Sequence, residues 1–112
     1  DGAEQLCTVT NEHSVQEGDV TFTQGRVDSI FDFAGTVSIV DPGFARRIVI
    51  EKENSASTIV WNPAEAKAAD MHHEDWKHFV CVEVGNVRQN AVFLQPGQSH
   101  TISLTITVEK LN

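Results

Sequence analysis

The sequence predicts an all-β fold, mainly an antiparallel β-sandwich, and three observations support this class. Near the C-terminus, Ile102, Leu104, Ile106 and Val108 alternate strictly with Ser and Thr. This period of two with β-branched residues predicts a strand with one buried face. Several shorter β-branched runs precede it, each bounded by turn residues. Only one segment favours a helix, which is the balance of elements expected of a sandwich.

Turn residues separate the remaining strand candidates. Asp41-Pro42-Gly43 combines the fixed φ of proline with the freedom of glycine, and 54–57 and 95–98 are further turns. The runs between these turns are rich in Val, Ile, Thr and Phe, which are typical of strands. The strands expected in chain order are 20–23, 27–33, 36–40, 47–51, 58–61, 79–87, 91–94 and 102–108.

One segment predicts a short helix, from Pro63 into the Trp76 region. The segment is rich in alanine, and Asn62 provides an N-cap with Pro63 at the first helical position. A helix of this length is not stable by itself, so we expect it to lie on the sheet.

Length and charge limit the classes of partner. The 112 residues suit one domain over 1–112, and the formal net charge is −8. Nucleic acids and anionic membranes require clustered Lys and Arg, so we expect neither as a partner. No apolar stretch approaches the roughly 18 residues that span a bilayer. The chain begins without Met or a signal peptide, so we expect it to be processed or cut from a longer protein.

The two cysteines, Cys7 and Cys81, are expected to be unpaired thiols in a reducing compartment. With no targeting segment in the sequence, we expect a cytoplasmic location. A bridge between Cys7 and Cys81 remains the alternative.

Glu83 is the one charged residue in the β-branched run from Phe79 to Val87. Alternation places the valines of this run on a core face and Glu83 on the opposite face with Gly85, where a ligand could approach the backbone. Glutamate is depleted in strands, so this carboxylate is a candidate general acid or base. From the residues alone, an ordinary surface charge is the alternative interpretation.

The run 79–87 resembles the C-terminal motif of the hexose-6-phosphate mutarotases, the glucose-6-phosphate 1-epimerase branch of the aldose 1-epimerase superfamily. Val60-Trp61-Asn62-Pro63 matches the W-N-P motif of this family, and Val20 to Asp28 resembles its F-T-G-E-V-D-R-V-Y segment. The resemblance extends from about Val20 to the end of the chain, with the motifs in the same order. Further similar segments are Asp41-Pro42-Gly43, Arg46-Arg47-Ile48, Leu94, Pro96-Gly97 and Ser99-His100-Thr101.

The resemblance implies part of a β-sandwich of galactose-mutarotase type that interconverts the α and β anomers of a hexose 6-phosphate. It also implies a reaction without a metal or an organic cofactor. A base removes the proton of the anomeric hydroxyl and an acid protonates the ring oxygen; the ring then opens and recloses. Carried over by motif, Glu83 corresponds to the general base and Asp28 to a carboxylate that binds sugar hydroxyls.

The resemblance covers only the C-terminal portion of the family. The catalytic histidine and the phosphate-binding arginines of the family fall outside it, and none of the five histidines here matches that histidine. Ser29 and Phe31 replace the family's Arg and Tyr beside Asp28. We therefore expect a truncated relative with little or no mutarotase activity of its own.

Three other interpretations remain open. A metal could bind at His72-His73-Glu74-Asp75 with His78. The chain could be a non-catalytic carbohydrate-binding module in which Trp61 and Trp76 stack on a sugar. Finally, half a sandwich leaves open strand edges and an apolar face, so we expect a homodimer or pairing with a separate N-terminal segment.

Overall fold

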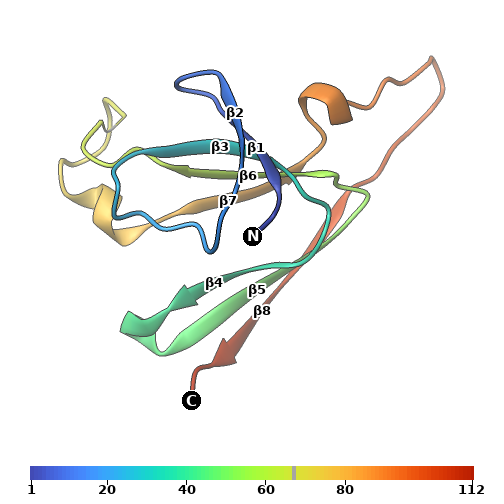
Figure 1. Ribbon diagram of the computed structural model, residues 1–112. Helices are drawn as coiled ribbons and strands as arrows, with labels where there is room; N and C mark the ends of the chain where they lie inside the picture. The colour runs from blue at the N-terminus through green and yellow to red at the C-terminus, as the bar shows by residue number, and fades with distance from the viewer. Residues whose placement is uncertain (67) are drawn as a thin grey trace. The chain divides into compact units, whose positions relative to one another are not determined.

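The computed structural model describes residues 1–66 and 68–112 and confirms the all-β class (Figure 1). Two antiparallel sheets and no α-helix occur in this described part, as expected of a galactose-mutarotase-type β-sandwich. The eight strands are β1 (Glu4–Cys7), β2 (Glu12–Val15), β3 (Val27–Asp32), β4 (Val37–Asp41), β5 (Arg46–Glu53), β6 (Ser57–Asn62), β7 (Cys81–Gly85) and β8 (Ser103–Lys110). Three short 3-10 helices are η1 (Pro42–Phe44), η2 (Asp75–His78) and η3 (Arg88–Asn90).

The chain divides into two compact units. The first comprises 1–33 and 57–83 and contains most of a five-stranded sheet in the order β2-β1-β3-β6-β7. The second comprises 34–56 and 84–112 and contains a three-stranded sheet in the order β4-β5-β8 (Figure 1).

The centre of the five-stranded sheet has one buried face. β3 and β6 are antiparallel, and directly opposed residues project to the same face. Ser29 faces Val60 and Phe31 faces Thr58, and all four are at most 8% exposed. Phe31 and Val60 therefore remove apolar area from water at the centre of this sheet.

The opposite face of the same two strands is more open. Asp28 lies opposite Trp61, and Ile30 lies opposite Ile59. All four are half-buried. We call the face that carries these residues the open face. It combines apolar side chains with a carboxylate and remains accessible to a ligand.

The second unit presents an apolar face. In its sheet, Val37, Ile50 and Ile106 are in register, as are Ile39, Ile48 and Val108. Of the β8 residues on this face, Leu104 is 47%, Ile106 58% and Val108 64% exposed. The predicted alternation in β8 is confirmed, but the predicted buried face is wrong, because all eight residues of the strand are exposed.

The helix expected from Pro63 to Trp76 does not form among the described residues. The Asn62 side chain caps a tight turn instead, since its Oδ1 accepts a hydrogen bond from the Ala64 N–H at 2.9 Å. Ala64 has a φ of 51°, in the left-handed region, which stops helix growth. The chain then turns until η2. Lys67, within the predicted helix, lies outside the described residues.

Two predicted strands are also wrong. Residues 20–23 enter a turn that ends at Gly25, where φ is 98°, and the Phe22 ring remains 37% exposed. Residues 91–94 follow η3 without ladder hydrogen bonds, and Phe93 is 87% exposed. Both runs have the β-branched or aromatic composition of strands, but neither has a neighbouring strand to pair with in the described part of the chain.

Candidate functional site

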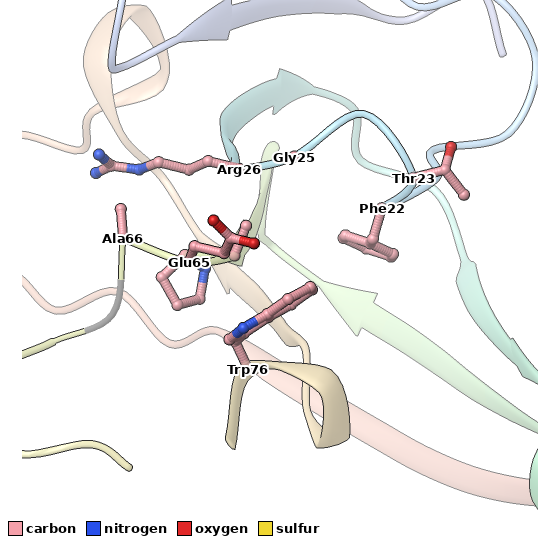
Figure 2. A pocket seen from close by; sticks show the side chains of 9 residues that line it. Phe22, Thr23, Gly25, Arg26, Glu65, Ala66 and Trp76 are labelled. Atoms are coloured by element: carbon pink, nitrogen blue, oxygen red, sulfur yellow. The ribbon is translucent and has the colours of Figure 1, made fainter. Parts of the chain in front are cut away.

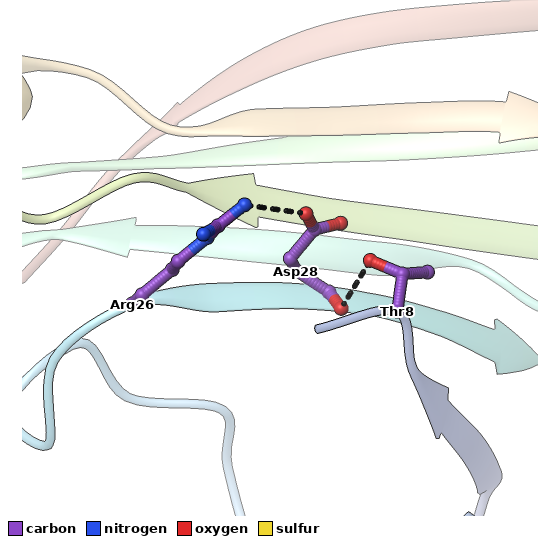
Figure 3. A network of polar contacts seen from close by, with 3 residues as sticks. All are labelled: Thr8, Arg26 and Asp28. Atoms are coloured by element: carbon purple, nitrogen blue, oxygen red, sulfur yellow. Dashed lines mark hydrogen bonds and ion pairs between the residues drawn. The ribbon is translucent and has the colours of Figure 1, made fainter. Parts of the chain in front are cut away.

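Asp28, the second residue of β3, is held by contacts with Thr8 and Arg26 (Figure 3). Its main-chain oxygen accepts hydrogen bonds from the Thr8 N–H at 2.9 Å and from the Thr8 hydroxyl at 3.2 Å. Its carboxylate lies 3.4 Å from the Arg26 guanidinium, and the side chain is 24% exposed. Asp28 is therefore fixed in position, partly neutralised and still accessible to a hydroxyl donor.

Glu83 is the exposed residue of β7, whereas its neighbours in the strand are half-buried. The valines 80, 82 and 84 are also half-buried. The face that was predicted to lie in the core is therefore only partly shielded from solvent. The exposure of Glu83 agrees with the expected surface position, but none of the three valines is buried in the core as predicted.

The open face extends to β7. The Phe79 ring lies 5.7 Å from the Trp61 ring, centroid to centroid, and Phe79 has an extended backbone. Because side chains alternate along an extended chain, Cys81 and Glu83 project to the same side as Phe79. Glu83 therefore shares the open face with Trp61 and Asp28. β6 separates the strands of the two carboxylates, so they lie two strand spacings apart, about 10 Å across the sheet.

Asn62 connects this face to the segment before β7. Its Nδ2 donates to the main-chain oxygens of Trp76 at 2.9 Å and Phe79 at 2.8 Å. Asn62 itself is 3% exposed. The W-N-P segment thus sets where η2 ends and where β7 begins, and so positions Glu83 indirectly.

Two cavities lie in the first unit. The larger, of about 420 Å³, is seen in Figure 2 and the smaller measures about 280 Å³. Asp28 lines the smaller cavity, Arg26 borders both, and Glu83 lines neither. The larger cavity is lined by Phe22, Thr23, Gly25, Arg26, Pro63, Ala64, Glu65, Ala66 and Trp76.

Sequence reasoning did not single out Arg26, Glu65 or Phe22. Arg26 could have been found, because it stands two residues before Asp28 and replaces the Glu of the family motif. Glu65 and Phe22 give no such signal, since only the fold brings them to one cavity. Trp76 was considered as a sugar-stacking residue, and it does line that cavity.

The histidines contribute no metal centre among the described residues. No group of three or more His, Cys, Asp or Glu side chains there could hold a metal ion. His72 and His73 stack at 4.3 Å between ring centroids, and His73 Nε2 lies 3.8 Å from the Glu74 carboxylate. Lys77 pairs with Glu74 and holds the pKa of that carboxyl below its usual range. The cluster is thus an exposed ion-pair network.

The two cysteines are free and have opposite electrostatic surroundings. Hydrogen bonds from the Thr10 side chain and main chain lower the pKa of Cys7. Burial, and then the Glu83 carboxylate, raise the pKa of Cys81. The pKa of Cys81 therefore depends on the charge of the Glu83 carboxylate.

Alkylation of the thiols tests this arrangement. Because the thiolate is the reactive form, we expect iodoacetamide at pH 8 to modify Cys7 several-fold faster than Cys81. Replacing Glu83 by Gln removes a negative charge and should lower the pKa of Cys81, so alkylation of Cys81 should become faster. Peptide mass spectrometry measures both rates. An unchanged Cys81 rate in the variant would show that Glu83 does not face this thiol.

No helix in the described part of the chain is long and apolar enough to cross a membrane.

The five-stranded sheet thus carries two accessible carboxylates, Asp28 on β3 and Glu83 on β7. Residues 3–107 match the family model described as aldose 1-epimerase, and the chain belongs to this family. A relative from Cenchrus ciliaris, named "Putative glucose-6-phosphate 1-epimerase", is 29% identical over 91 residues. That alignment covers 78% of this chain and 27% of the relative, so the chain spans about a quarter of the relative's length. No solved structure matches the chain.

Proposed function

We propose that this chain carries the general base of a hexose-6-phosphate 1-epimerase and corresponds to the C-terminal part of such an enzyme. The family match over residues 3–107 carries the proposal. Two features support it: Glu83 is exposed on β7, and Asp28 is an accessible carboxylate on β3. The 29% identity to the relative named for glucose 6-phosphate favours a phosphorylated hexose as substrate.

The proposed reaction is acid–base ring opening. The Glu83 carboxylate takes the proton of the anomeric hydroxyl while an acid gives a proton to the ring oxygen, and the C1–ring-oxygen bond breaks to form the aldehyde. Rotation about C1–C2 and reversal of both proton transfers give the other anomer. Asp28 accepts hydrogen bonds from sugar hydroxyls, and the neighbouring Arg26, 3.4 Å from its carboxylate, helps to hold it in position for this role. The proposed steps use no metal or cofactor.

We further propose that these 112 residues alone catalyse weakly. None of the five histidines lies on β3, β6 or β7, the strands of the open face, and none matches the catalytic histidine of the family. Loss of one member of an acid–base pair lowers the rate by a factor of roughly 10²–10⁴. The free thiols fit a reducing compartment, and we propose a cytoplasmic location.

Anomer equilibration of glucose 6-phosphate, followed by polarimetry, tests the proposal. Imidazolium can supply the missing acid from solution, so we expect weak acceleration by the chain alone and a clear increase when imidazole is added. The rate with imidazole and no protein is the background. No acceleration above this background would contradict the proposed function, and full acceleration without imidazole would contradict the proposed impairment.

We also propose that the chain associates through the apolar face of β8, with a second copy or with a separate N-terminal segment. Ile106 and Val108 are 58% and 64% exposed, and β8 is an edge strand of its sheet. Exposed apolar faces and unpaired strand edges favour association.

Light scattering measures the association. We expect the chain to dimerise at high concentration and Ile106→Lys to weaken the dimer roughly 100-fold, because a lysine would be buried without a partner. Thr107→Lys is the matched control, since Thr107 lies on the opposite face of β8. A strictly monomeric chain at high concentration would contradict this proposal.

A further inference from the structure

The larger cavity contains the groups that recognise a phosphorylated sugar. The Trp76 indole, the Phe22 ring and the Glu65 carboxylate border one space in Figure 2, and the Arg26 guanidinium extends along its edge away from Phe22. Phe22 and Glu65 are exposed and Trp76 is half-buried, so these groups are accessible from solvent. Its volume of about 420 Å³ falls within the usual range of small-molecule sites.

We propose that this cavity, which adjoins the open face through the Arg26–Asp28 ion pair but is not lined by Glu83, is a binding site for a phosphorylated pyranose. The choice of ligand rests on the proposed function. The Trp76 and Phe22 rings cover the C–H face of the sugar, and the Glu65 carboxylate accepts hydrogen bonds from its hydroxyls. Arg26 binds the phosphate.

The charges in the cavity favour this orientation of the ligand. The Nη2 atom of Arg26 lies 3.4 Å from the Asp28 carboxylate. A guanidinium has five N–H donors in all, so this ion pair does not occupy every donor. Arginine binds phosphate through paired hydrogen bonds, which a single lysine cannot reproduce. The ammonium of Lys77 lies 5.7 Å from the Trp76 ring centroid, but its charge is paired with the Glu74 carboxylate, so Arg26 is the cation that lines the cavity. Glu65 repels phosphate, so the phosphate binds at the Arg26 end and the hydroxyls at the Glu65 end.

Loop geometry maintains the cavity without the ligand. Gly25 has a φ of 98°, a conformation that other residues adopt only with strain, and this lets the chain pass from Phe22 to Arg26 in a tight turn. On the other side, Pro63 is fully buried and Ala64 is 8% exposed. The Asn62 hydrogen bond to the Trp76 main chain holds η2 against this turn. The backbone of these two segments therefore holds the lining residues of the cavity in place.

The two tryptophans allow one titration to distinguish the two sites. Trp76 lines the cavity, whereas Trp61 lies opposite Asp28 on the open face. We expect glucose 6-phosphate to shift the indole N–H resonance of Trp76, with Trp61→Phe used to assign the signals. Glucose and inorganic phosphate are the comparison probes. Each should bind at least about tenfold more weakly, since glucose lacks the phosphate contact and phosphate lacks the sugar contacts.

Arginine variants test the phosphate contact. We expect Arg26→Ala to weaken glucose 6-phosphate binding at least about tenfold, measured from the Trp76 shift. Arg47→Ala is the matched control, because Arg47 is also an exposed arginine paired with a carboxylate, Glu109, and it should bind normally. Glu83→Gln should leave binding in the cavity unchanged, because Glu83 does not line it.

The outcomes separate this proposal from the proposed function. A shift of Trp61 without Trp76, equal binding by Arg26→Ala and the unsubstituted chain, or no shift of either signal would overturn the cavity as the site. A Trp76 shift that depends on Arg26 supports it, even where no anomer interconversion is detected. Inorganic phosphate that binds as tightly as glucose 6-phosphate would overturn the sugar contacts.

Discussion

Replacing Glu83 by Gln is expected to remove the acceleration of anomer equilibration that the chain shows in the presence of imidazole, by a factor of at least about 100. Gln preserves the size of the side chain but cannot accept the anomeric proton. Since Glu83 is exposed on β7 and contributes little to the core, the variant should fold normally. Polarimetry with glucose 6-phosphate measures the rate, and circular dichroism checks the fold.

A second glutamate provides the control for this substitution. Glu51 is an exposed strand residue on β5, in the second unit. Glu51→Gln removes the same charge from the chain and should leave the rate unchanged. If Glu83→Gln and Glu51→Gln had equal rates, the general base would lie elsewhere.

Replacing Asn62 by Ala is expected to destabilise the chain by about 3 kcal/mol, because one buried and two part-buried hydrogen bonds are lost and their main-chain partners remain. The turn at Ala64, the end of η2 and the approach to β7 all depend on this side chain. Urea unfolding measures the free energy. Because small domains are marginally stable, a partly unfolded variant at 25 °C would agree with this expectation.

The exposed C-terminal residue serves for comparison. Asn112→Ala should change the free energy of unfolding by less than about 0.5 kcal/mol. A cost below about 1 kcal/mol for Asn62→Ala would show that the W-N-P segment does not organise the site.

Periodicity predicted most of the longer strands. β3, β4, β5, β6 and β8 begin and end within two residues of the expected ranges. Their alternating β-branched residues express a local preference that the sheets satisfy. The burial of β8 was not predictable from this pattern, because alternation gives the faces of a strand but not what covers them.

The first hairpin gave no comparable signal. β1 and β2 are only four residues each, and Glu4, Gln5, Glu12 and His13 make them polar. They form because β1 pairs with β3 on one side and β2 on the other. Such pairing between distant segments cannot be derived from composition.

The predicted helix from Pro63 does not form in the described part of the chain, although the capping role predicted for Asn62 is correct. Asn62 does cap the following residues, but its side chain also reaches the main chain of Trp76 and Phe79. These distant contacts fix a tight turn, which tertiary structure favours over the alanine-rich helix. The same contacts create the cavity beside Trp76, so the error and the unpredicted site have one cause.

The candidate site was predictable in part. Glu83 stood out as a charge within a valine-rich strand, and it is the one exposed residue of β7. Its relation to Asp28 required the strand order β3-β6-β7, which no local pattern contains. The structure establishes the ion pair of Asp28 with Arg26, which their spacing of two residues could have suggested.

Magnetisation exchange between the two C1 resonances of glucose 6-phosphate, recorded by NMR at equilibrium, tests most directly whether Glu83 opens the sugar ring. With imidazole present, the chain should raise the exchange rate in proportion to its concentration, and the Glu83→Gln chain should leave it at the rate of imidazole alone. An exchange rate that does not depend on the chain, or that is the same for both chains, would contradict Glu83 as the general base.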